Sequence, residues 1–351
     1  MANIAVYTPE ITIYYSSIVI ALGAAAFFAL AYAVYAANGG SRIAMLFFIP
    51  LCTVLSLGLS RLIHWYCHVE QYVSLESAMT DYSTGSFCIP GILLGIVLSV
   101  LLLRLVRLNR NAWHMLDCTA PAAALGLSVI RMSSLFNDAC RSKIIITDPR
   151  LQHYPLAATV SASGGSAEYR FATFFAEALL YFVLAVVIMV FFVRRREQPV
   201  KEKCRADGNV FLMFLTGYGA IEFVLDSTRY DSSFFPFNGF ISIVQISAFA
   251  IMLFVLVYYS VYSVKANGRR KYHWLSWLGF FLIFAGAGVC EYLVQRHGDW
   301  YLGCYAAMSA AVIAGAVLDY AMYRSVCLPA AKPAEPQSES GGESTAEAQS
   351  E

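Results

Sequence analysis

Ionisable residues stand inside or beside segments of this chain that are otherwise apolar. A charged side chain in the bilayer interior costs about 2.5–3.5 kcal/mol on insertion scales, so a charge that persists there is a functional candidate. Guanidinium groups hold phosphate oxygens in a bidentate fork, and a carboxylate or imidazole can accept a proton during catalysis. The candidates are Arg61, His64, Arg131, Arg170, Glu177, Glu222, Asp226 and Arg229.

The spacing of these residues predicts which of them share a helix face. Glu222 and Asp226 are four residues apart, so one helix would carry them on the same side. Arg170 and Glu177 are seven residues apart, which also predicts a common face. Several arginines at one depth would suit the anionic headgroup of a phospholipid.

The same residues also have a structural interpretation. Arginines near helix ends often extend to the membrane interface, and this applies to Arg61 and Arg229. Glu222 and Asp226 could form salt bridges with an arginine of another span instead of acting in catalysis. His64 could likewise be an interface histidine. Arg131 lies deeper and is flanked by small residues, so among these candidates it has the strongest case for a functional role.

The composition places these residues in a membrane protein. Hydrophobic residues make up 59% and charged residues 13% of the 351 residues, whereas soluble domains carry about 25% charged residues. The hydrocarbon core of a bilayer requires about 20 apolar residues per helix. We therefore predict an all-α fold, a polytopic transmembrane helix bundle of about nine spans, at residues 16–37, 43–63, 88–106, 115–135, 171–193, 209–225, 240–264, 275–294 and 301–323.

Basic residues indicate how the bundle lies in the membrane. Lysine and arginine cluster in alternate loops, at 104–110, 194–205 and 265–271, and such loops are typically cytoplasmic. This predicts an N-terminus outside, a C-terminus in the cytoplasm and the candidate charges in the outer half of the membrane. The segment 136–170 would form a small extracytoplasmic subdomain. The acidic tail 329–351 is rich in Pro, Ser and Gly and is predicted to be disordered.

Several function classes receive no support from the sequence. A net charge of +1 gives no argument for binding nucleic acid. The nine cysteines show no CxxC spacing, so we expect neither a metal site nor another cofactor. Cys67, Cys88 and Cys140 lie near the predicted outer face, and a disulfide between two of them is one alternative. The N-terminus lacks the basic region of a signal peptide, so the first apolar segment is expected to remain as a helix.

Short motifs occur in an order that is similar to one membrane-enzyme family. One segment, LDCTAPAAALGLSVIRMSSLFNDA, is similar to the motif D-x-x-A-P followed by G-R-x-G-N-F-x-N-x-E. Arg131 occupies the arginine position of the second motif, and Asn137 occupies its second asparagine position. SRLIH keeps Arg61 of G-R-x-G-Y, and RFATFFAE keeps Arg170 and Glu177 of R-H-P-x-Q-L-Y-E. From about residue 10 to residue 264, the chain thus resembles the bacterial prolipoprotein diacylglyceryl transferases.

The last shared motif also carries substitutions. YGAIEFVLDSTR keeps Tyr218 and Arg229 of Y-G-x-x-R-F-x-x-E-F-x-R and places Asp226 where the family has Glu. The first arginine of that motif is replaced by Glu222, a reversal of charge. The histidine of the family's F-H-G-G turn falls on Cys88 or on Pro90, depending on a one-residue gap, and two further spans follow the family's seven.

The resemblance implies transfer of a diacylglyceryl group from phosphatidylglycerol to the lipobox cysteine of secreted precursors, or to a related acceptor. It implies residence in the bacterial cytoplasmic membrane, a transferase-like domain over 1–264 and two additional helices over 265–328. A non-catalytic phospholipid-binding relative is the alternative, and a transporter is a third. The implied catalytic residues are Arg131, Asp226, Glu177 and His64, and the implied substrate-binding residues are Arg61, Arg170, Asn137, Tyr218, Glu222 and Arg229.

Overall fold

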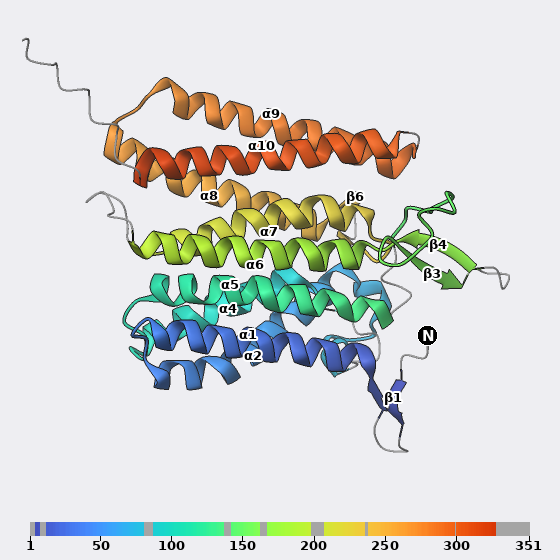
Figure 1. Ribbon diagram of the computed structural model, residues 1–351, viewed down its shortest axis with the longest axis horizontal. Helices are drawn as coiled ribbons and strands as arrows, with labels where there is room; N and C mark the ends of the chain where they lie inside the picture. Colours follow the sequence, from blue (N-terminus) through green and yellow to red (C-terminus); the bar gives the residue numbers. More distant parts are fainter. Residues whose placement is uncertain are drawn as a thin grey trace, which may run out of the picture.

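The computed structural model shows long helices that run side by side, with short β-hairpins gathered at one end of the bundle (Figure 1). It describes residues 4–7, 12–80, 87–136, 142–161, 167–197, 207–235, 238–298 and 300–327.

In the described part of the chain, nine apolar helices build the bundle and confirm the predicted all-α membrane fold. Eight of them are long and apolar enough to cross a membrane within the described ranges. The helix α4 is shorter, with 17 residues. The nine are α1 (Tyr15–Ala37), α2 (Arg42–Cys67), α4 (Ile89–Leu105), α5 (Ala112–Arg131), α6 (Thr173–Glu197), α7 (Asn209–Thr228), α8 (Ile243–Asn267), α9 (Lys271–Arg296) and α10 (Tyr301–Cys327).

Short elements cover the end of the bundle where α1 begins. Three antiparallel hairpins lie there, β1 (Ile4–Tyr7) with β2 (Thr12–Tyr14), β3 (Ala157–Ser161) with β4 (Ala167–Phe171), and β5 (Phe234–Phe235) with β6 (Asn238–Ser242) (Figure 1). The short helices are α3 (Leu75–Thr80) and the 3-10 segments η1 (Val69–Gln71) and η2 (Met132–Phe136).

The helices pack both with chain neighbours and, for α1 with α5, across the chain order. The closest pairs are α2 with α4, α1 with α5, α5 with α6, α7 with α8, and α9 with α10. The helix α10 also packs on α8 and α7, so the last two helices join the rest of the bundle through these neighbours. Figure 1 shows α9 and α10 along the edge opposite α1 and α2. As a result, α5, α6 and α7 lie in the middle, where charges are best shielded from lipid.

Two glycines allow α2 and α4 to approach closely. A Cβ atom added to Gly91 would lie 2.5 Å from the Cα of Ser60, and one added to Gly95 would lie 2.4 Å from the Cα of Ser56. These glycines form the G-x-x-x-G spacing that permits close contact between membrane helices. The hydroxyl of Ser60 donates to the carbonyl of Cys88 at 2.9 Å. This contact fixes the height of Arg61 beside the start of α4.

The N-terminus of α7 is held by a carboxylate of α5. Asp117 accepts hydrogen bonds from the backbone N–H groups of Gly208 (2.6 Å) and Phe211 (2.8 Å). The first N–H groups of a helix lack partners within it, and an acidic side chain there also offsets the helix dipole. Asp117 therefore locks α7 to α5 at the end of the bundle opposite the hairpins.

The structure corrects the prediction that Arg170 and Glu177 share a helix face. Arg170 belongs to strand β4 and pairs with Ala158 of β3, whereas α6 begins only at Thr173. The backbone N–H of Ala172 donates to the carbonyl of Leu156 instead of entering the helix. Their spacing of seven residues therefore does not place Arg170 and Glu177 on one helix face.

The predicted tail 329–351 and Asn137 lie outside the described residues.

Candidate functional site

Arg131 joins three helices through buried ion pairs. It is the last residue of α5, and its Nη2 donates to Oε1 of Glu222 on α7 at 2.5 Å. Its Nε lies 3.1 Å from Oε2 of Glu177 on α6. Both glutamates are fully buried, and the arginine side chain is 8% exposed. The predicted salt bridge between Glu222 and Arg131 is thus present, and Glu177 shares the same guanidinium group.

Two tyrosines surround Glu222. The Tyr181 hydroxyl donates to the same oxygen, Oε1, at 2.5 Å, from the turn of α6 that follows Glu177. Tyr218 lies one turn before Glu222 on α7, and its ring centroid is 6.4 Å from that of Tyr181. The hydroxyl of Tyr218, Oε1 of Glu177 and Oε2 of Glu222 are buried and have no hydrogen-bond partner among the described residues. These three atoms leave the site able to form hydrogen bonds with a further polar group.

Arg229 follows the end of α7 and connects the buried network to the partly exposed side chain of Asp231. Its Nη1 lies 3.4 Å from Oε2 of Glu177. Its Nε and Nη2 donate to the two carboxylate oxygens of Asp231, at 3.0 Å and 2.8 Å. This is a bidentate arrangement of the kind that guanidinium groups also make with phosphate. Arg229 is therefore the cation of the network that has a partly exposed partner.

Asp226 faces a different neighbour from Glu222, although both belong to α7. Its Oδ2 accepts a short hydrogen bond from the hydroxyl of Ser242, at the junction of β6 and α8. Its backbone carbonyl accepts from Ser232 at 2.5 Å and from the N–H of Arg229 at 3.1 Å. The structure gives this buried carboxylate a hydroxyl donor, whereas Glu177 and Glu222 have guanidinium partners. It can therefore exchange a proton more readily than a carboxylate in an ion pair.

Carboxylates outnumber guanidinium groups in this network. Burial of an unbalanced charge is costly, so the surplus carboxylate favours a proton or a polar ligand in the site. The Arg131 guanidinium is already engaged by two glutamates, and an anionic headgroup must compete with them. We name this set the Arg131 network; its members are Arg131, Arg229, Glu177, Glu222 and Asp226, with Tyr181 and Tyr218 beside them.

Arg61 and His64 form a second group, on α2. Arg61 is 2% exposed and its guanidinium lies 5.6 Å from the ring centroid of Phe87. His64 stacks on His68, with ring centroids 4.2 Å apart, and meets the edge of the Tyr72 ring. In this structure His64 thus packs, buried, in an aromatic cluster.

Arg170 lies on strand β4 of the β3–β4 hairpin. It pairs with Glu168 of the same strand, with 2.9 Å between Nη2 and Oε2, and lies 5.7 Å from the ring centroid of Tyr230. Because Tyr230 follows Arg229 in the chain, Arg170 lies near the end of the Arg131 network that Arg229 forms. It does not join the Arg131 network through any contact among the described residues.

Tyr181 and Ser242 are site residues that sequence reasoning missed. Tyr181 follows Glu177 by four residues, which places both on one helix face, but tyrosine is common in membrane belts. Ser242 caps α8 in an S-x-x-Q capping box, in which the Ser242 N–H donates to Oε1 of Gln245 at 3.1 Å. A capping pattern of this kind marks a helix start but does not indicate contact with Asp226.

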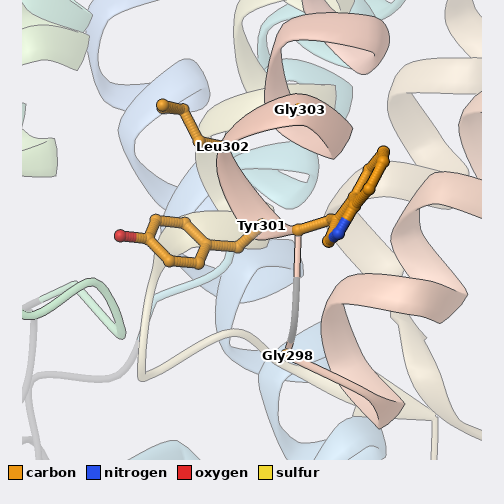
Figure 2. A pocket seen from close by; sticks show the side chains of 5 residues that line it. Gly298, Tyr301, Leu302 and Gly303 are labelled. Atoms are coloured by element: carbon orange, nitrogen blue, oxygen red, sulfur yellow. The ribbon is translucent and has the colours of Figure 1, made fainter.

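Other features of the described chain do not add to the site. Cys67 and Cys88 are buried free thiols, and no group of three or more His, Cys, Asp or Glu residues could hold a metal ion in the described ranges. Figure 2 shows a surface hollow at the turn between α9 and α10, lined by Gly298, Trp300, Tyr301, Leu302 and Gly303. Its exposed aromatic side chains are typical of a membrane interface and bring no charge.

The Tyr181→Phe substitution should test the hydroxyl contact to Glu222. Hydrogen bonds to charged groups contribute about 1.5–3 kcal/mol, so we expect the free energy of unfolding to fall by that amount. Denaturant unfolding of protein in lipid nanodiscs would measure it. Tyr218→Phe is the matched control, because its hydroxyl has no hydrogen-bond partner in the part of the chain that the structure describes. Equal losses for the two variants would contradict a role for the Tyr181 contact.

Comparison with known proteins places this geometry in a family. Residues 3–261 match the model of the family described as prolipoprotein diacylglyceryl transferase. No curated protein matches the chain. The match covers α1 to most of α8, together with every member of the Arg131 network, and it ends before α9.

Proposed function

The chain belongs to the prolipoprotein diacylglyceryl transferase family, and from this premise we propose that it is a divergent membrane transferase. The proposed reaction moves a diacylglyceryl group from phosphatidylglycerol to a thiol, the lipobox cysteine of a secreted precursor or a related acceptor. The Arg131 network carries the proposal, because it places cations, a hydroxyl-bonded carboxylate and unpaired polar atoms at one end of three central helices.

The proposed chemistry assigns a task to each group. The thiol sulfur attacks the glyceryl carbon that bears the phosphate, a C–S bond forms, and the C–O bond to phosphate breaks so that glycerol phosphate leaves with the electron pair. Asp226 accepts the thiol proton, since its partner is a hydroxyl that can rearrange. Arg131 and Arg229 stabilise the charge that develops on the leaving phosphate. Glu177 and Glu222 orient Arg131, and the unpaired hydroxyl of Tyr218 is placed to bind the substrate.

Two other arginines are proposed to guide the lipid into the site. Arg170 lies on the β3–β4 hairpin near Tyr230, and it is placed to meet the headgroup first. Arg61, beside Phe87 at the start of α4, would hold the phosphate from the side of α2. His64 is proposed as a second proton acceptor only if it leaves the stack with His68.

The multi-pass fold fits the bacterial cytoplasmic membrane as the proposed location. In the proposed orientation the N-terminus lies outside and the C-terminus in the cytoplasm, because the basic loops lie at the end of the bundle opposite the hairpins. The Arg131 network would then face the side to which secreted precursors are exported. This orientation supports an acceptor that arrives from outside.

Complementation would test the proposed reaction. The chain would be expressed in cells depleted of their own prolipoprotein diacylglyceryl transferase, and the mass of one lipoprotein would be followed. We expect the mass of a diacylglyceryl cysteine to return with this chain and to remain absent with Arg131→Ala, both proteins being confirmed in the membrane. An unmodified lipoprotein in the presence of the chain would contradict the lipobox acceptor.

A phospholipid-binding relative without turnover is the second candidate. The observation that favours it is the double engagement of Arg131 by Glu177 and Glu222, together with Cys88 or Pro90 at the place of the family's histidine. It predicts that native mass spectrometry of the purified chain finds bound phospholipid, whereas incubation with phosphatidylglycerol and a lipobox peptide releases no glycerol phosphate. Release of glycerol phosphate would exclude it.

A further inference from the structure

Glu291 is a buried carboxylate on α9, outside the residues that match the family. It is 1% exposed, and its Oε2 accepts a hydrogen bond from the hydroxyl of Ser227 at 2.5 Å. Ser227 directly follows Asp226 on α7. A charged residue of the additional helices thus contacts the turn that carries Asp226 and Arg229.

The contact is part of a closed ring of hydrogen bonds. Gln295 donates through Nε2 to Oε1 of Glu291 at 2.8 Å, and Lys143 of the outer loop donates through Nζ to Oε1 of Gln295 at 3.1 Å. The backbone N–H of Lys143 donates to the carbonyl of Thr228 at 2.8 Å, which returns the ring to α7. Both oxygens of Glu291 are therefore satisfied, as burial of a charge requires.

Lys143 supplies the positive charge that balances this ring. Burial lowers the pKa of Lys143, while the neighbouring carboxylates of Glu291, Asp226 and Asp231 act in the opposite direction. The Lys143 ammonium also lies 5.4 Å from the ring centroid of Phe234. The outer loop, α7 and α9 are thereby held together by one polar cluster beside the Arg131 network.

The residues from Asp226 to Arg229 are held by side chains from several elements of the protein. Asp226 bonds to Ser242, and Ser227 bonds to Glu291. Thr228 shares a hydrogen bond of 2.8 Å with Thr173 at the start of α6, and Arg229 pairs with residues of α6 and the following loop. In this turn the additional helices contribute Glu291 of α9 and also Tyr305 of α10, whose hydroxyl donates to the carbonyl of Ser227 at 3.4 Å.

A separate hydrogen bond holds the additional helices against α7 deeper in the bundle. Thr216 of α7 donates to Oδ2 of Asp319 on α10 at 3.0 Å. Thr216 precedes Ser227 by 11 residues, which is three helical turns and about 16 Å along the axis. Because this pair holds α10 against α7 away from the site, a hairpin that served only as a membrane anchor would not need Glu291.

We propose that Glu291 is a positioning residue for the turn Asp226–Arg229, so that the additional helices form part of the site. Its effect on transfer rests on the proposed function, whereas its effect on the turn does not. Without the Glu291 acceptor, Ser227 loses its side-chain partner and the Gln295–Lys143 chain loses its end. The turn then samples conformations in which Asp226 and Arg229 leave their positions.

Hydrogen exchange in nanodiscs would test the positioning role without any assay of activity. In Glu291→Leu, the amides of Lys143 and Arg229, which donate to carbonyls of this turn, should exchange roughly tenfold faster than in the unaltered chain. Ser227→Ala, which removes the donor instead, should give the same change. Glu291→Gln keeps an acceptor and should remain near the original rate. Asp319→Asn, in the same hairpin, is the matched control and should leave these amides unchanged.

Turnover would give the second readout where transfer is detected. A misplaced site should lower kcat by about 10- to 100-fold in Glu291→Leu, with KM for phosphatidylglycerol within about threefold, and Glu291→Gln should restore most of kcat. Unchanged exchange in Glu291→Leu and Ser227→Ala would overturn the proposal, as would equal acceleration in Asp319→Asn. Faster exchange without any transfer by the unaltered chain would support the positioning role and contradict the proposed function instead.

Discussion

Arg131→Ala is expected to abolish transfer and to lower the free energy of unfolding by about 3–5 kcal/mol. The substitution leaves Glu177 and Glu222 buried without the cation that joins them. In the proposed reaction it also removes a donor to the leaving phosphate, which costs about 100- to 1,000-fold in rate by comparison with other preorganised donors. Thermal unfolding in nanodiscs and release of glycerol phosphate would measure the two effects.

Matched variants separate loss of the fold from loss of chemistry. Arg131→Lys keeps a charge but cannot reach two carboxylates with the geometry of a guanidinium group, so it should recover part of the stability and little of the transfer. The triple variant with Arg131→Ala, Glu177→Gln and Glu222→Gln removes the uncompensated charges and should be more stable than Arg131→Ala alone. Normal transfer by Arg131→Ala would contradict the central place of this residue.

Glu222→Arg should be the most disruptive single change in the network. The substitution restores the residue that the family motif carries, and resemblance alone would predict a gain of activity. The structure predicts the opposite, because the new guanidinium would face Arg131 in a fully buried position and Tyr181 would lose its acceptor. We expect a loss of at least about 3–5 kcal/mol of stability, as when a buried pair is broken. The recovery of monodisperse protein and its unfolding temperature would measure it.

Glu222→Gln is the control for this reversal of charge. It keeps an oxygen that can accept from Arg131 and Tyr181 and adds no positive charge, so it should lose less stability than Glu222→Arg. A stable Glu222→Arg protein with higher transfer would show that the network rearranges around a third arginine. That result would show that the site functions with the arginine of the family motif. It would contradict the inference that a surplus carboxylate favours a proton or a polar ligand in the site.

The two substitutions address one physical feature of this chain. The replacement of an arginine by Glu222 is compensated inside the protein, since its carboxylate binds Arg131 and accepts from Tyr181. In the proposed reaction, two of the cations left to bind a lipid phosphate are Arg229 and Arg170, and each of them is paired with a carboxylate. Activity would therefore depend on a headgroup that can displace a carboxylate partner from these arginines.

The sequence by itself determined the helical framework. The predicted spans 16–37 and 209–225 correspond to Tyr15–Ala37 and Asn209–Thr228, and the other spans differ from the observed helices by at most four residues at either end. The physical reason is local, because a segment in lipid must satisfy its backbone hydrogen bonds internally and must present apolar side chains along its own length. Charged residues within such segments stand out for the same reason, and Arg131, Glu177 and Glu222 were identified from this contrast.

Only the tertiary structure decided which charges meet. Arg131 and Glu222 are 91 residues apart, and their contact depends on how α5 packs between α6 and α7. The boundary between β4 and α6 separated Arg170 from Glu177, although their spacing suggested a common face. Glu291 reaches Ser227 because α9 ends beside the last turn of α7. Such partners are fixed by helix packing, which side-chain shapes across several helices determine together, and no single segment encodes it.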